Sequence, residues 1–289
     1  MDKVVVIGGG GFVGSHTADI LSERGFDVHI FDTKESPWKK KNQNMIIGDI
    51  LCKGDLDNAI TGAKYVYHFA GIADIAASTE DPLTTINLNI LGTSNILQSC
   101  VDMKIERLIF ASTMYVYSPY GSFYRATKQS AELLIEVFSE TFNLDYSLLR
   151  YGSLYGPRSQ EWNGLRGYVE QVIKNGSIEY RGLGKERREY IYVRDAAGLS
   201  VDILDKNYIN QAITVTGNQV MYSEEMIDMI FEIAGKEKKI TYNNNPEKDL
   251  DHYLNTPYRY SPKKAMKVVP QQFLDLGEGI LELIEEISN

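Results

Sequence analysis

The chain has 289 residues, and its 43% hydrophobic and 24% charged residues are ordinary for a soluble globular protein. This length allows one large domain or two smaller domains that share a core. The 30 basic and 39 acidic residues give a net charge of −9. That balance argues against nucleic acid or a membrane surface as a partner.

We expect a cytoplasmic protein without a metal site. No signal peptide is visible, and no apolar run approaches the roughly 20 residues of a membrane span. Cys52 and Cys100 stand in unrelated contexts, as expected of free thiols in a reducing compartment. The four histidines show no metal-ligand spacing.

The N-terminal stretch predicts a strand, a glycine turn and a helix. Residues 4–7 form a continuous apolar run, which is typical of a buried parallel strand. Gly8, Gly11 and Gly14 follow, and a helical pattern then continues through Leu21. In a dinucleotide site Gly8 would permit the tight turn, Gly11 the approach of a pyrophosphate and Gly14 close helix–strand packing. The alternative is a flexible glycine turn.

A second predicted strand, residues 28–31, ends in Asp32. A carboxylate at this position can accept hydrogen bonds from both hydroxyls of an adenosine ribose. It would repel a 2′-phosphate, so NAD is favoured over NADP, although Lys34 moderates the preference. The alternative is an exposed aspartate in a turn.

Further strands are expected at residues 45–47, 65–69, 107–111 and 144–150, alternating with helical patterns. This alternation predicts a doubly wound parallel α/β sheet. Asp49 follows the third strand and could reach an adenine edge or serve as a turn or cap residue. Ala70 follows the fourth strand, where a small residue would let the cofactor backbone pass, and His68 is expected to be a packed strand residue.

Tyr124 and Lys128 lie one turn apart on the same face of a predicted helix. A nearby ammonium favours phenolate and would lower the tyrosine pKa from its usual value of about 10. Such a pair can exchange a proton with a carbinol oxygen while a hydride moves elsewhere. The alternative is an ordinary helix with a solvated lysine.

The last part of the chain is less regular. Helical patterns fit residues 167–174, 224–234 and 273–287. Arg187 and Arg188 precede a strand-like run and could face an anionic ligand or solvent. The prediction is an NAD-binding Rossmann domain at residues 1–153, joined again by about residues 189–216, with residues 154–289 forming a smaller C-terminal α+β substrate-binding cap.

Taken together, these motifs resemble the extended short-chain dehydrogenase/reductase family, in particular its NAD-dependent epimerase/dehydratase group. The resemblance implies that Tyr124, Lys128 and Thr113 are catalytic. It implies that the cofactor-binding residues are Gly8, Gly11, Phe12, Val13, Gly14, Asp32, Asp49, Ile50, Ala70 and Lys128. The implied substrate-binding residues are Thr113, Tyr124, Arg188 and Arg158.

The sequence also departs from the family pattern. The segment between Tyr117 and Tyr124, which in relatives helps to wall the sugar pocket, has only six residues, 118–123. Another element, such as the loop at 158–167, would then close the pocket. Met114 and Tyr115 stand where dehydratases carry an acidic pair, so dehydration is not expected. A second diphosphate-binding arginine expected near residues 246–249 is missing.

The resulting prediction is an NAD-dependent nucleotide-sugar epimerase or oxidoreductase that acts on a sugar hydroxyl through a keto intermediate, with Tyr124 as general base. One alternative is an NAD(P)H-dependent keto-sugar reductase, and a non-enzymatic alternative is an NAD(P)-sensing binding module. The family resemblance also implies a homodimer that is formed by the helices at about 83–102 and 124–142.

Overall fold

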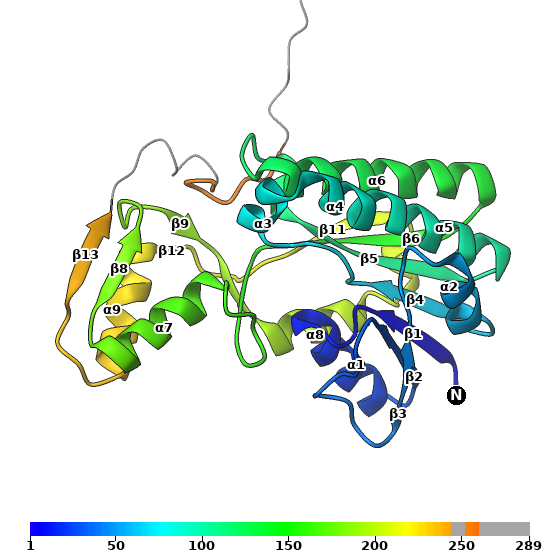
Figure 1. The fold of residues 1–289 in the computed structure, drawn as a ribbon, viewed down its shortest axis with the longest axis horizontal. Helices are drawn as coiled ribbons and strands as arrows, with labels where there is room; N and C mark the ends of the chain where they lie inside the picture. The colour runs from blue at the N-terminus through cyan, green and yellow to red at the C-terminus, as the bar shows by residue number, and fades with distance from the viewer. Residues whose placement is uncertain (244–251, 260–289) are drawn as a thin grey trace, which may run out of the picture.

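A computed structural model describes residues 1–243 and 252–259. Its centre is a seven-stranded parallel sheet with the order β11-β6-β5-β4-β1-β2-β3 (Figure 1). The strands are β1 (Lys3–Ile7), β2 (Asp27–Asp32), β3 (Gln43–Ile47), β4 (Tyr65–His68), β5 (Arg107–Thr113), β6 (Asp145–Tyr151) and β11 (Gln211–Val215). The predicted doubly wound parallel α/β fold is confirmed.

Helices cover both faces of the sheet (Figure 1). One apolar core lies between the sheet and α2 (Lys53–Ile60), α5 (Gly92–Asp102) and α6 (Ser122–Phe142). The second core lies between the other face and α1 (Phe12–Glu23) and α8 (Val193–Asp202). Residues 4–7 of β1 have no exposed surface, because a central parallel strand is buried on both faces.

The strand order reverses at β1, since β2 and β3 lie on one side and β4, β5 and β6 on the other. In open α/β sheets such a reversal leaves a crevice at the carboxyl ends of the strands, where ligands bind. Gly8 follows β1 and Ala70 follows β4. A Cβ atom on Gly8 would lie 2.5 Å from the Ala70 nitrogen, so the two loops meet at this point.

The helix predicted at about 83–102 is observed as one run of helical backbone over residues 82–102 that contains a π turn. The structure contains α3 (Ile75–Glu80) and α4 (Pro82–Ile86), then a π-helical turn, η1 (Asn87–Leu91), and finally α5. A π turn inserts one extra residue into the helical repeat and is often found at functional sites. Here it turns Asn89 inward, where the residue is 3% exposed.

The cap is a small α+β unit at one end of the sheet (Figure 1). Strands β8 (Ile178–Arg181) and β13 (Ile240–Asn243) pair in parallel and pack with α7 (Gly164–Asn175) and α9 (Ser223–Ile233) around a third apolar core. The helices predicted at 167–174 and 224–234 are therefore confirmed. The helix predicted at 273–287 and the segment 246–249 lie outside the described residues.

Short strands connect the cap with the sheet. They are β7 (Ser153–Tyr155) with β10 (Tyr190–Tyr192), and β9 (Arg187–Arg188) with β12 (Met221–Tyr222). Two short 3₁₀ turns, η2 (Met114–Tyr117) and η3 (Lys206–Tyr208), complete the elements. The chain enters the cap after β6 and returns to the sheet as β11, which pairs with β6.

Candidate active site

The glycine turn lies between β1 and α1. Gly8 has a φ of 79°, which glycine adopts without steric cost. A Cβ atom on Gly14 would collide with the Gly8 carbonyl oxygen, so α1 packs directly on the turn. Gly11 caps α1 without a side-chain hydrogen bond, which leaves the first backbone N–H groups of the helix for a ligand. These N–H groups and the helix dipole suit a pyrophosphate, so this turn fits the dinucleotide of NAD.

Phe12 and Val13 form the first turn of α1. Phe12 is 6% exposed, and Val13 packs against the core on the α1 face of the sheet. Their side chains are therefore engaged in packing. Any contact of these two residues with a phosphate would come from the backbone N–H groups.

Asp32 lies at the carboxyl end of β2, beside the glycine turn. Its Oδ2 accepts a hydrogen bond of 2.9 Å from the Gly10 N–H, and its Oδ1 accepts one of 2.8 Å from the Thr33 N–H. These bonds hold the carboxylate where the ribose of a dinucleotide would lie. The geometry therefore fits NAD at this position.

Asp49 and Ile50 follow β3. The Asp49 Oδ1 accepts a hydrogen bond of 2.9 Å from the Leu51 N–H, so the side chain closes a turn. Ile50 is buried and packs against Gly92, and the Asn95 side chain donates to its carbonyl oxygen at 3.1 Å. The turn alternative for Asp49 is thus observed, and a contact with adenine stays a prediction.

Tyr124, Lys128 and Thr113 come together where α6 crosses the carboxyl end of β5. The Lys128 Nζ donates to the Ala111 carbonyl oxygen at 2.8 Å and lies 4.6 Å from the centre of the Phe110 ring. The Tyr124 side chain is hydrogen-bonded to Thr113. The spacing that the sequence suggested therefore produces a compact group of a phenol, an ammonium and a hydroxyl.

The pKa values of this group are set mainly by burial. Burial raises the pKa of Tyr124 to about 12, and the hydrogen bond with Thr113 offsets part of that increase. Burial lowers the pKa of Lys128 to about 8, and the charge of Glu132 opposes that decrease. The prediction of a lowered Tyr124 pKa is wrong for this structure, because the desolvation of a phenolate outweighs the favourable interactions around it.

The start of α6 is held by tight local contacts. Gly121 precedes the helix with a φ of 103°, and a Cβ atom there would lie 2.7 Å from the Tyr115 ring. The Arg125 side chain donates to the Ser118 and Pro119 carbonyl oxygens at 3.1 and 3.0 Å. These contacts allow the short 118–123 segment to deliver Tyr124 directly after η2.

Asn89 in the π turn connects the loop after β4 with α6. Its Oδ1 accepts from the Ile72 N–H at 2.8 Å, and its Nδ2 donates to the Ile72 carbonyl oxygen at 2.9 Å and to the Thr127 hydroxyl at 3.0 Å. No role was predicted for Asn89 from the sequence. The signal for it in the sequence is an amide side chain within an otherwise apolar helical stripe, which the fold buries between the helices.

His68 is a packed strand residue, as expected. It is 1% exposed, and its Nε2 lies 2.9 Å from the Thr93 hydroxyl. Burial lowers the pKa of His68 to about 3, and the charge of Lys128 contributes to the decrease. The imidazole is therefore neutral over the physiological pH range.

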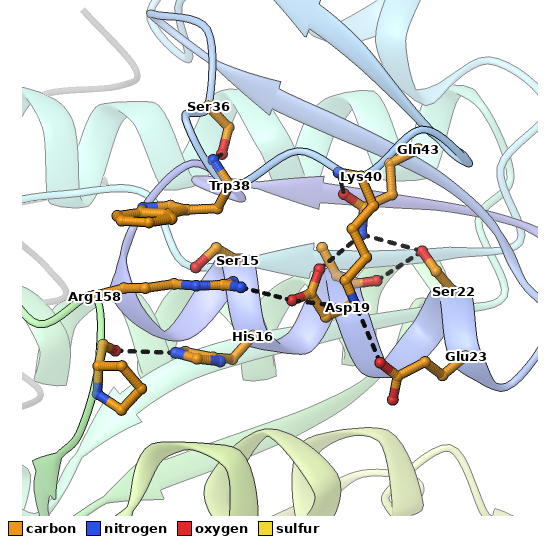
Figure 2. A network of polar contacts seen from close by, with 12 residues as sticks. Ser15, His16, Asp19, Ser22, Glu23, Ser36, Trp38, Lys40, Gln43 and Arg158 are labelled. Atoms are coloured by element: carbon orange, nitrogen blue, oxygen red, sulfur yellow. Dashed lines mark hydrogen bonds and ion pairs between the residues drawn. The ribbon is translucent and has the colours of Figure 1, made fainter.

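Arg158 lies against α1 and the loop after β2 (Figure 2). Its Nη2 pairs with the Asp19 carboxylate of α1 at 2.9 Å, and its guanidinium lies 5.2 Å from the Trp38 ring in the loop after β2. The neighbouring Pro157 carbonyl oxygen is 3.0 Å from the His16 Nε2. This network fastens the loop that leads into the cap onto α1, and no contact of Arg158 with the Tyr124 group is observed among the described residues.

Arg158 also lines an open cavity of about 330 Å³ between residues 155–159 and α7. Leu165, Arg166 and Glu170 form the opposite wall. Arg166 pairs with Glu170 at 2.7 Å and also donates to the Ser159 carbonyl oxygen. The cavity is not lined by Tyr124, Lys128 or Thr113, so it is separate from that group.

Arg188 is engaged by a segment from the C-terminal part of the chain, residues 252–259, which we call the strap. Its guanidinium lies 4.5 Å from the Tyr253 ring, and its Nη1 donates to the Tyr253 carbonyl oxygen. Tyr253 also packs on Tyr115, with ring centres 4.6 Å apart, and the His252 Nδ1 lies 2.5 Å from the Tyr115 hydroxyl. Because the Tyr115 ring meets the Tyr124 ring edge-on, the strap reaches the neighbourhood of Tyr124.

Among residues 1–243 and 252–259, no group of three or more His, Cys, Asp or Glu side chains could hold a metal ion. Cys52 is exposed and Cys100 is buried, and both are free thiols. Within the same described ranges, no helix is long and apolar enough to cross a membrane.

Comparisons with known proteins agree with this geometry. The model of the NAD dependent epimerase/dehydratase family matches residues 4–217. A putative UDP-glucose 4-epimerase of Methanocaldococcus jannaschii is 28% identical over 99% of this chain and 98% of its own length.

Two solved structures are also similar. The UDP-glucose 4-epimerase of Thermus thermophilus, crystallised with NAD, has a TM-score of 0.79 and 27% identity over 90% of each chain. The UDP-N-acetylglucosamine 4-epimerase of Methanobrevibacter ruminantium, in complex with UDP-N-acetylmuramic acid, has a TM-score of 0.80 and 26% identity over 90% of each chain.

A Rossmann sheet with a Tyr–Lys pair beside its fifth strand defines an extended short-chain dehydrogenase/reductase. The family match covers most of the chain. The chain therefore belongs to the NAD-dependent epimerase/dehydratase family, and it is an NAD-dependent enzyme of that group.

Proposed function

We propose that this enzyme is a nucleotide-sugar epimerase that oxidises a sugar hydroxyl to a ketone and then reduces the ketone from the opposite face. The observation that carries the proposal is the convergence of Tyr124, Lys128 and Thr113 at the carboxyl end of β5. Binding of a dinucleotide alone requires no such group, whereas proton transfer at a carbinol oxygen does.

The proposed chemistry assigns one role to each side chain. Tyr124 removes the proton from the sugar hydroxyl and returns a proton to the ketone oxygen. Thr113, hydrogen-bonded to Tyr124, orients the reacting oxygen, and Lys128 holds the nicotinamide ribose. NAD supplies the acceptor and donor of the hydride. Because the pKa of Tyr124 is about 12, its protonated form dominates at neutral pH, and turnover is expected to increase as the pH rises from 6 towards 8.

For the cofactor we propose contacts from the glycine turn and from the ends of β2, β3 and β4. They comprise Gly8, Gly11, Phe12, Val13, Gly14, Asp32, Asp49, Ile50 and Ala70, together with Lys128. The hydrogen bonds of Asp32 beside the glycine turn support this assignment. They also support NAD rather than NADP, because the carboxylate would face a 2′-phosphate.

For the substrate we propose a UDP-linked sugar. The relatives whose names contain UDP-glucose or UDP-N-acetylglucosamine support this class. Arg188 is proposed to bind the diphosphate, and Thr113 and Tyr124 the sugar. The pairing of Arg158 with Asp19 favours a role in holding the cap loop against α1 in place of the expected contact with the substrate.

The test is a panel of UDP-glucose, UDP-glucuronic acid and UDP-N-acetylglucosamine, each incubated with the enzyme and NAD and analysed for the C4 epimer by NMR. The expected result is conversion of at least one sugar with catalytic NAD and no net formation of NADH. Stoichiometric NADH consumption with a keto-sugar would instead identify the reductase. Conversion of none of the three sugars would contradict the proposed UDP-sugar epimerase.

Three broader assignments belong to the same proposal. They are a homodimer, a cytoplasmic location, and a division into an NAD-binding domain and a cap at about residue 153. The apolar side chains exposed on the outer helices support the homodimer, the two free thiols are compatible with the location, and the separate core of the cap supports the division.

A further inference from the structure

Helix α6 carries a buried carboxylate in line with Tyr124 and Lys128. Glu132 lies one turn beyond Lys128, and the residue is 3% exposed. The proposed reaction gives it no role. A carboxylate in such a place needs partners, because burying an isolated charge costs roughly several kcal/mol even after the protein relaxes around it.

Glu132 is bound from both neighbouring strands. Its Oε1 accepts hydrogen bonds from the Ser112 hydroxyl at 2.5 Å and from the Arg150 Nε at 2.9 Å. Its Oε2 accepts a hydrogen bond from the Arg150 Nη2 at 2.6 Å. Arg150 therefore grips the carboxylate in the two-pronged geometry that makes such pairs strong and directional.

These contacts lie directly behind the proposed catalytic group. Ser112 precedes Thr113 in β5, and Ala111, which accepts the hydrogen bond of Lys128, precedes Ser112. Two successive residues of β5 are thus tied to two successive turns of α6. The position of Thr113 relative to Tyr124 depends on this pair of ties.

The charge of Glu132 affects the pKa of Lys128, because the other titratable groups near the lysine are neutral or already paired. His68 faces Lys128 from β4 and is neutral, since its pKa is about 3. Tyr124, on the preceding turn, is neutral at pH 7 because its pKa is about 12. Arg150 comes from β6, and its guanidinium is paired with the carboxylate. Glu132 is therefore the anion that opposes the loss of the Lys128 proton.

We propose that Glu132 is a positioning residue of the catalytic group, which fixes the end of β5 against α6 and keeps Lys128 in its ammonium form. A buried ion pair adds little net stability, because desolvation cancels most of the attraction. The Glu132–Arg150 pair is thus poorly explained as a stabilising contact. A role in protonation and alignment explains its place one turn after Lys128.

The test compares Glu132→Gln with Glu140→Gln, which removes a carboxylate from an exposed position two turns further along the same helix. NAD affinity is measured by calorimetry between pH 6 and 9.5, and kcat is measured over the same range with the best UDP-sugar substrate. Loss of the Glu132 charge should lower the Lys128 pKa further, so the alkaline decline of NAD affinity and the pH at which kcat stops rising should both move about one pH unit lower. At pH 6, NAD affinity should stay within about threefold of wild type, because Lys128 remains protonated there.

If NAD affinity and kcat each changed by a constant factor at every pH, with no shift along the pH axis, the proposal would be overturned and Glu132 would be a structural residue. A shift with Glu140→Gln of the same size would overturn it as well. Ser112→Ala separates alignment from charge, since it should reduce kcat about tenfold while leaving the alkaline decline of NAD affinity in place. An unchanged kcat in that variant would refute the alignment role.

If Glu132→Gln does not fold, the double variant Glu132→Gln/Arg150→Met removes both buried charges and leaves no uncompensated cation. Because this variant also removes a cation, its shift in the alkaline decline of NAD affinity should have the same direction as that of Glu132→Gln but a smaller size. This inference rests on the proposed function only for the kcat measurement. If wild-type protein converts no sugar, the proposed function fails, and the pH dependence of NAD affinity still tests Glu132.

Discussion

At the scale of single residues, turnover is expected to depend most strongly on the hydroxyl of Tyr124. Tyr124→Phe keeps the ring that packs edge-on against Tyr115 but removes the proton carrier. The rate kcat should fall by roughly 10²–10⁴-fold, the usual contribution of a general acid–base. NAD affinity should remain nearly normal, because the glycine turn and Asp32 are untouched.

Thr113→Ala is the comparison for that variant. It removes the hydrogen bond to Tyr124 but leaves the phenol, so its loss of kcat should be smaller. Steady-state kinetics with the best substrate and calorimetry with NAD provide both readouts. If Tyr124→Phe kept more than about a tenth of wild-type kcat, Tyr124 would not be the general base.

Cofactor choice is also decided by one residue. Asp32 holds its carboxylate beside the glycine turn through the Gly10 and Thr33 N–H groups, where a 2′-phosphate would meet a negative charge. Calorimetry should therefore give a lower Kd for NAD than for NADP, and Asp32→Ala should narrow the difference. Adding Lys34→Ala to that variant should weaken NADP again. Equal affinities of the wild-type protein for the two cofactors would contradict the assignment.

Residue types and spacing were enough to predict that Tyr124 and Lys128 lie side by side, because a helix brings residues four apart onto one face. Thr113 was added to this pair by the family resemblance alone. Spacing could not reveal the partners of Glu132 and Asn89, since Arg150 and Ile72 reach them only through the fold. The direction of the Tyr124 pKa shift was missed for a related reason. The sequence shows that a lysine is near, but not how completely water is excluded.

At the scale of elements, the strap lies against Tyr115, whereas the loop at 158–167 was the element that the sequence suggested for closing the sugar pocket. In that loop, Arg158 and Arg166 pair with Asp19 and Glu170. The strap is held by the burial of Tyr253, which is 5% exposed. It is also held by a hydrogen bond of 2.8 Å that the Arg187 backbone N–H donates to the Leu254 carbonyl oxygen. It is therefore anchored to the same strand that carries Arg188.

His252→Leu removes the hydrogen bond to the Tyr115 hydroxyl while keeping an apolar side chain in the strap. If the strap positions Tyr115 beside the sugar, the KM for the UDP-sugar should rise about five- to tenfold, the value of one hydrogen bond. The Kd for NAD should not change. Leu254→Ala, at a side chain that is 59% exposed, is the control, and an equal rise in KM there would exclude a specific role for His252.

The long elements were predictable because strands and helices alternate with clear hydrophobic periods. The π turn at Asn87–Leu91 was not, because one extra residue shifts an apolar stripe too little to break the pattern. The two-residue strands β9 and β12 were missed as well. They depend on pairing across the fold, and no period can be read from two residues.

At the scale of the whole molecule, apolar side chains are exposed on the outer helices. They are Leu83 of α4, Leu91 of η1, and Leu133 and Val137 of α6. In Figure 1 these helices lie together on one outer face. A second copy packed against this face would remove their apolar surface from water.

Leu133→Glu should therefore convert a dimer into a monomer, because it places a charge in the centre of the proposed interface. Leu199→Glu is the control, since Leu199 is also exposed but lies in α8 on the opposite face of the sheet. Sedimentation velocity at micromolar concentration separates the two states. A wild-type protein that sediments as a monomer would refute the proposed homodimer.

The pairing of β11 with β6 affects how the chain can assemble as it leaves the ribosome. These two strands are neighbours in the sheet, yet the whole of residues 152–210 lies between them in the chain. Until residues 152–215 have been synthesised, β6 is an edge strand with unpaired backbone N–H and C=O groups and with apolar side chains such as Leu148 and Leu149. Exposed edge strands readily pair with strands of other molecules. A fragment that stops near residue 153 should therefore precipitate, and one that continues past Val215 should stay in solution.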